Sequence, residues 1–135
     1  MRSSLSPQNK GFTGRLKSST ATKYLLLFLF LVLGYYLNSA YRPYMYRNGL
    51  NDFGIADIGT NFFFIPMGLL MQSILPKKNA FTEKRKFILY SFLALAAHEL
   101  LSYWIPMLGH FDFKDVIGLA IGGILAVKMD DFFEE

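Results

Sequence analysis

The 135-residue chain contains no cysteine, only one tryptophan, and few charged residues, which make up 18% of it. The absence of cysteine excludes disulfide bonds, thiolate metal sites and cysteine nucleophiles. The low share of charge, beside 53% hydrophobic residues, leaves too little polar surface for a water-soluble fold. No zinc, phosphate-loop or hydrolase signature occurs either. We therefore expect an integral membrane protein with no metal or cofactor, and a non-catalytic role is favoured over an enzymatic one.

Four apolar runs are candidates for membrane-spanning helices, since a helix needs about 20 residues to cross the hydrocarbon core. They cover about 24–41, 55–75, 87–108 and 113–129. The fourth is short for a full crossing, which a tilt or a locally thinned bilayer accommodates. We predict an all-α membrane domain of four transmembrane helices over residues 23–129.

The fourteen lysine and arginine residues indicate the orientation, because cytoplasmic loops hold the excess of positive charge. The loops 42–54 and 109–114 contain only three of them and are predicted to be extracytoplasmic. Both termini are then cytoplasmic. This distribution also accounts for the net charge of +4, so nucleic acid is not an expected partner. The basic residues on the cytoplasmic side are Arg2, Lys10, Arg15, Lys17, Lys23, Lys77, Lys78, Lys84, Arg85, Lys86 and Lys128.

The two ends of the chain differ from the membrane domain in composition. Residues 1–22 are basic and rich in Ser and Thr without an apolar period, which predicts a disordered cytoplasmic arm. An arm of this kind before an apolar run is also typical of a signal peptide, and Asn38-Ser39-Ala40 offers small residues for cleavage. The tyrosines around that point and the charge pattern favour an uncleaved anchor. Residues 130–135 are predicted to form a short acidic cytoplasmic tail.

Polar and ionisable residues within or beside the apolar runs are candidates for function, because such groups are costly in lipid. Alternate helices run in opposite directions, so the start of the second, the end of the third and the start of the fourth lie at the same outer surface. Glu99 lies deeper, near the middle of the third run. The predicted polar cluster, for a ligand or for structure, consists of Asp57, Asn61, His98, Glu99, His110, Asp112 and Asp115.

Several of these residues also have purely structural interpretations. Asp112 or Asp115 is suited to capping the fourth helix, because a carboxylate there accepts backbone N–H bonds and opposes the helix dipole. Asp57 and Asn61 are suited to hydrogen bonds between helices. For Glu99 the functional interpretation is favoured, because a carboxylate in the middle of a span is expensive to keep.

Small residues and prolines predict how the helices pack. Gly118 and Gly122, continued at Ala126, form a G-x-x-x-G pattern that permits close approach of another helix, with packing inside the bundle favoured over a homodimer. Pro66 and Pro106 fall inside the second and third runs, where they can kink a helix.

Two stretches have an order and spacing seen in a known family. Asn61 is followed by a short apolar run and then by Pro66-Met67-Gly68, and Glu99 is followed by residues 109–117, with an Asp opening the next helix, and by Gly122. These stretches resemble the motifs of the VanZ-like family of small bacterial membrane proteins. The resemblance covers about residues 57–126.

The resemblance implies a bacterial cell-envelope protein of the inner membrane. The chain departs from the family's pattern at Ser102, His110 and Leu119, where the family commonly has Gln, Arg and Asn. The leading hypothesis is a non-catalytic envelope-associated or accessory protein whose cluster binds a lipid headgroup, a polar envelope ligand or another membrane subunit.

Two further hypotheses stay open at this point. One is a protomer of an oligomeric transporter or channel, with Glu99 and His98 as a proton or ion relay. The other is an intramembrane enzyme that uses carboxylates as acid and base, or holds a metal with His110, Asp112 and Asp115. The expected partners are membrane lipid and either other membrane subunits or further copies of the chain.

Overall fold

The structure, a computed structural model, describes residues 19–76 and 83–134, so most of the predicted basic arm and the loop 77–82 lie outside the described residues. Within those ranges every regular element is helical and there is no strand, which confirms the predicted all-α class. The elements are α2 (Thr20–Tyr36), η1 (Leu37–Tyr41), α3 (Arg42–Arg47), α4 (Ile55–Phe62), α5 (Phe64–Ile74), α6 (Lys84–Trp104), η2 (Pro106–Leu108) and α7 (Phe113–Glu134).

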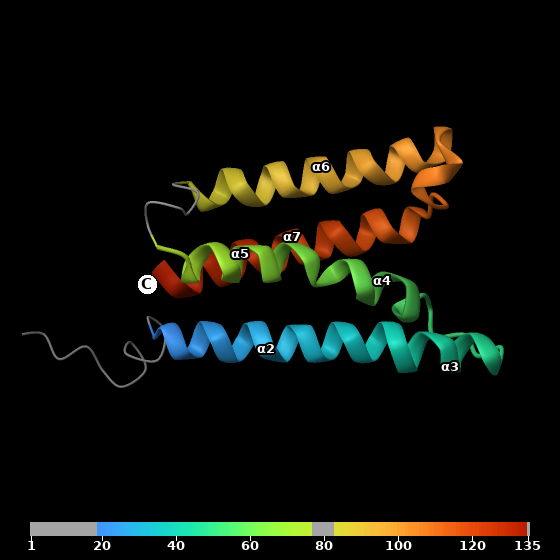
Figure 1. The fold of residues 1–135 in the computed structure, drawn as a ribbon, viewed down its shortest axis with the longest axis horizontal. Coiled ribbons are helices and arrows are strands. Elements are labelled where there is room, and N and C mark those ends of the chain that lie inside the picture. The colour runs from blue at the N-terminus through green and yellow to red at the C-terminus, as the bar shows by residue number, and fades with distance from the viewer. Residues whose placement is uncertain (1–18, 77–82, 135) are drawn as a thin grey trace, which may run out of the picture.

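The helices form an elongated bundle in which α7 is the central element (Figure 1). Helix α7 packs against α4, α5 and α6, while α2 packs mainly against α5. The start of α2, the start of α6 and the end of α7 lie at one end of the bundle. The connections from α3 to α4 and from α6 to α7 lie at the opposite end. Successive long helices therefore run in opposite directions.

The first helix extends further than the apolar run predicts. It continues through η1 and α3 to Arg47, so half of the predicted loop 42–54 is helical. The π-helical turn η1 ends at Tyr41, two residues before Pro43, whose ring has no backbone N–H to donate. A wide turn at this point accommodates the missing hydrogen bond without ending the helix.

The second apolar run is two helices, because α4 ends at Phe62 and α5 begins at Phe64. Pro66 is the third residue of α5, where the first-turn N–H groups have no intrahelical partner, so it costs no hydrogen bond. Pro106 does not lie inside the third helix as predicted. That helix ends at Trp104, and Pro106 opens the 3-10 turn η2.

The predicted acidic tail is instead the last part of α7. Asp130 is only 2% exposed, and its carboxylate lies 3.3 Å from Nε of Arg85 and 3.8 Å from Nζ of Lys84. Nζ of Lys23 lies 5.2 Å from the centre of the Phe133 ring. These contacts join the start of α2 and the start of α6 to the end of α7.

The hydrophobic core is small and lies between α5, α6 and α7, around Ile65, Leu69, Ile88 and Ala126. Much apolar surface stays exposed, and no residue of Thr20–Arg47 is buried. Thr20–Arg47 and Lys84–Trp104 are long and apolar enough to cross a membrane. Large apolar side chains are exposed on both of these helices, a pattern that is typical of membrane proteins.

Candidate functional site

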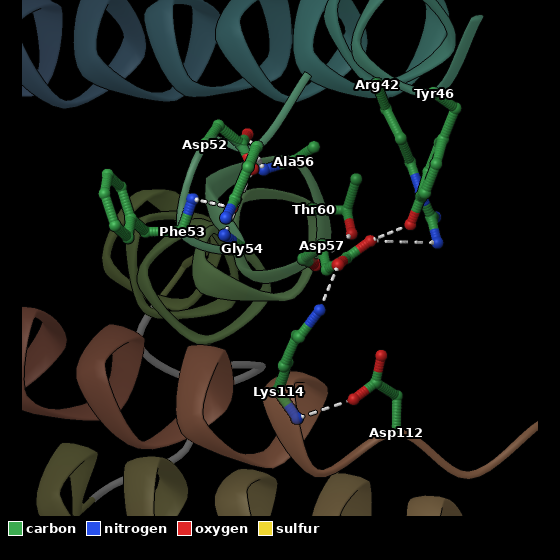
Figure 2. Close-up of polar contacts among 11 residues, drawn as sticks. Arg42, Tyr46, Asp52, Phe53, Gly54, Ala56, Asp57, Thr60, Asp112 and Lys114 are labelled. Carbon is green, nitrogen blue, oxygen red and sulfur yellow. Dashed lines mark hydrogen bonds and ion pairs between the residues drawn. The ribbon is translucent and has the colours of Figure 1, made fainter. Parts of the chain in front are cut away.

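The buried carboxylate of Asp57 joins three elements at the end of the bundle that holds the α3–α4 connection (Figure 2). Its Oδ2 lies 2.8 Å from Nζ of Lys114 on α7. Its Oδ1 accepts a hydrogen bond from the hydroxyl of Tyr46 on α3 and lies 3.7 Å from Nη2 of Arg42. Asp57 is 8% exposed, so these three partners replace most of its hydration.

Two other aspartates shape the helix starts around this network. The Asp52 side chain accepts the backbone N–H groups of Gly54, at 3.1 Å, and Ala56, at 2.7 Å, which satisfies donors that the start of α4 leaves free. Asp112 accepts the backbone N–H of Lys114 at 2.9 Å and so caps α7. Capping is thus the structural role that Asp112 fills, one of the two alternatives predicted for this pair of aspartates.

A cavity of about 520 Å³ lies between α2, the α4–α5 junction, α6 and α7. Part of its wall is aromatic and aliphatic, and part is polar. The polar lining residues are Asn38, Arg42, Thr60, Asn61, Glu99 and Asp115. The others are Phe30, Leu31, Gly34, Tyr35, Phe63, Phe64 and Met67. We call this space the polar cavity.

Charges of both signs face the polar cavity. The amide of Asn61 and the carboxylate of Asp115 line it together, and the Arg42 guanidinium interacts electrostatically with that carboxylate. Glu99, whose side chain is 17% exposed, lies within electrostatic range of Asp115 and Asp112. The cavity therefore offers carboxylates to a cation or a hydroxyl group and a guanidinium to an anion.

The structure brings together three of the predicted cluster residues, Asn61, Glu99 and Asp115, which come from three different helices. Asp57 instead lines a smaller, neighbouring cavity of about 210 Å³ together with Lys114. The separation follows from the ion pair, because Lys114 draws the Asp57 side chain toward the start of α7.

The two histidines lie apart from the polar cavity. His98 is not among its lining residues; its side chain is 55% exposed, and its Nδ1 lies 4.0 Å from Oε1 of Glu99. His110 lines a separate cavity beside Ser102, whose hydroxyl donates to the carbonyl of Glu99 at 2.6 Å. Among the residues that the structure describes, no three His, Asp or Glu side chains are grouped so as to hold a metal ion.

Sequence reasoning missed Arg42, Tyr46 and Lys114 as members of the site. In the sequence, Arg42 and Lys114 are distinguished only as two of the three basic residues in the predicted outer loops. Their position in the sequence could have identified them. Basic residues are uncommon outside the cytoplasmic segments, so each one is a candidate for an ion pair. Asp57 is that partner for both.

The fold and the site define a helical-bundle protein with long apolar helices and a polar cavity near one end. Residues 4–129 match the VanZ/LLP1 family, and the chain belongs to that family, as its motifs predict. Comparison with curated proteins and with solved structures gives no match.

Proposed function

We propose that this VanZ-like protein is a non-catalytic, envelope-associated protein of the bacterial inner membrane whose polar cavity binds the polar group of an amphiphilic envelope molecule. The observation that supports this is the composition of the cavity wall. Phe30, Phe63 and Phe64 provide an apolar side, and Glu99 and Asp115 face the same space. A site with both kinds of wall suits a molecule that has a lipid part and a polar head.

The proposal includes four membrane crossings with both termini in the cytoplasm. The helices α2–α3 and α6 have the length and the apolar character of spans, and α4–α5 and α7 run beside them (Figure 1). The start of α2 and the end of α7 lie at the same end of the bundle, as an even number of crossings requires. In this orientation the polar cavity lies toward the extracytoplasmic side.

The same orientation explains the network around Asp57. Arg42 and Lys114 are basic residues on the outer side, and their shared carboxylate partner offsets one of their two positive charges. The network also ties α3 and α7 to α4 next to the cavity, which holds its walls in place for binding. Glu99 and Asp115 both line this cavity, and their carboxylate oxygens can accept hydrogen bonds from a ligand.

Mass spectrometry of the full chain purified in mild detergent tests the proposal, with the bound lipids and envelope precursors identified. Glu99→Gln combined with Asp115→Asn keeps the shape of both side chains and removes both charges. We expect the variant to lose most of the molecule that the wild type retains, because each charged hydrogen bond contributes about 1.5–3 kcal/mol. His98→Gln is the matched control, since His98 neighbours Glu99 but does not line the cavity. Equal retention by the wild type and the double variant would contradict the proposal.

A further inference from the structure

A second hollow lies between α6 and α7 and shares no lining residue with the polar cavity. It has a volume of about 380 Å³. Its wall is almost entirely aliphatic and aromatic, with Ile88, Leu89 and Phe92 from α6 and Ile124 and Val127 from α7. We call it the apolar groove.

Two cationic side chains, Arg85 and Lys128, line the groove as well. They come from the first turn of α6 and from the last two turns of α7, so both belong to the end of the bundle where these helices start and end (Figure 1). The groove therefore has charge at one end and hydrocarbon along the rest of its length.

Both cations retain N–H donors that can bind an anion. Arg85 uses Nε toward Asp130 and Nη2 toward Asp131, but a guanidinium has five N–H donors in all. Lys128 is exposed, and it has no ion pair with another residue of the described ranges 19–76 and 83–134. An exposed ammonium group beside an apolar groove is complementary to a phosphate that bears acyl chains.

We propose that the apolar groove binds an anionic phospholipid, with its phosphate at Lys128 and Arg85 and an acyl chain along Ile88, Phe92 and Ile124. A free phosphate would not cover the apolar wall, and a neutral lipid would place no net negative charge beside Lys128. Basic pockets between helices on the cytoplasmic side of membranes bind anionic headgroups in this way. If the topology proposed above holds, this lipid belongs to the cytoplasmic leaflet. The binding itself does not depend on that topology.

Native mass spectrometry of the full chain tests this, with dioleoyl phosphatidylglycerol and dioleoyl phosphatidylcholine added in equal amounts. We expect the wild type to retain phosphatidylglycerol preferentially. Lys128→Gln should weaken that binding about fivefold, the effect of one basic group at a membrane surface. Lys86→Gln is the matched control, because it removes the same charge nearby but Lys86 pairs with Glu83 and does not line the groove. The control should bind as the wild type does.

Two further variants make the result decisive. Ala120→Phe places a ring in the groove and should lower retention of both lipids, with helicity by circular dichroism showing that the chain is folded. Glu99→Gln, in the polar cavity, should leave phosphatidylglycerol binding unchanged, so failure of this inference and failure of the proposed function are separable. Equal phosphatidylglycerol binding by Lys128→Gln and the wild type would overturn the inference. A two-chain particle without lipid that Ala120→Phe converts to single chains would overturn it too, because that result would assign the groove to a second copy.

Discussion

Gly122 on α7 lies directly against the backbone of Phe62 at the end of α4, so close that a Cβ on Gly122 would be 2.2 Å from the Phe62 carbonyl oxygen. Gly118, one turn earlier, has the same relationship with the carbonyl of Ile58, at 2.7 Å. The G-x-x-x-G pattern thus packs inside one chain. This contact positions α4, and with it Asp57 and Asn61, against the start of α7.

Gly122→Ala is expected to destabilise the fold strongly. A methyl group cannot fit beside a backbone oxygen without moving α4, and overpacking of this kind costs about 1–3 kcal/mol of unfolding free energy. Thermal unfolding in detergent measures the change. Gly123→Ala is the matched control, because its Cβ would meet only the Ile65 side chain at an ordinary 3.7 Å. If both variants unfold at the same temperature, α7 does not pack on α4 as described.

The Asp57–Lys114 pair should show energetic coupling. Asp57→Asn and Lys114→Gln each remove one member, and we expect the double variant to lose about 1 kcal/mol less than the sum of the single losses. The value is modest because the Lys114 side chain is 50% exposed. Urea unfolding of the four proteins measures it. Asp57→Asn with Lys86→Gln should be additive, since Lys86 pairs with Glu83. Additivity in the first pair would show that the 2.8 Å contact contributes nothing to stability.

Asp130 and Asp131 should differ although they are neighbours in the chain. Asp130→Asn removes a buried charge between Lys84 and Arg85, and we expect a loss of about 1.5–3 kcal/mol in unfolding free energy, the range for interactions with charged groups. Asp131→Asn removes a carboxylate that is 49% exposed and should cost under about 1 kcal/mol. Thermal unfolding of the two variants compares them directly. A larger loss for Asp131→Asn would mean that Asp130 is not the residue that joins α6 to α7.

The proposed topology predicts opposite reporter signals in the two loops that flank α6. A fusion at residue 80 should be active only as a cytoplasmic reporter, and a fusion at residue 111 only as an external one. The reason is the excess of lysine and arginine around residue 80. The same signal from both fusions would exclude a crossing by α6. The reversed pair would invert the orientation and move the polar cavity to the cytoplasmic side.

The sequence by itself determined the helical class, the two long apolar helices and the family. These properties depend on composition and on the order of residues along the chain, and both can be obtained without knowing which helices are in contact. The candidate polar residues were also identifiable, because an Asn, an Asp or a Glu is unusual within an apolar run. The helix limits were less predictable, since Pro66 at the start of α5 costs no hydrogen bond, whereas a proline in a helix interior does.

Only the tertiary structure decided which of those residues act together. Asn61, Glu99 and Asp115 meet at one cavity, but Asp57, four residues before Asn61, is turned to Lys114 and Tyr46. Asp130 is buried between basic residues, although the composition of residues 130–135 predicts a short acidic tail. The physical reason is that burial and charge pairing depend on which helix faces meet. That choice is made by packing contacts, such as Gly122 on Phe62, between residues far apart in the sequence.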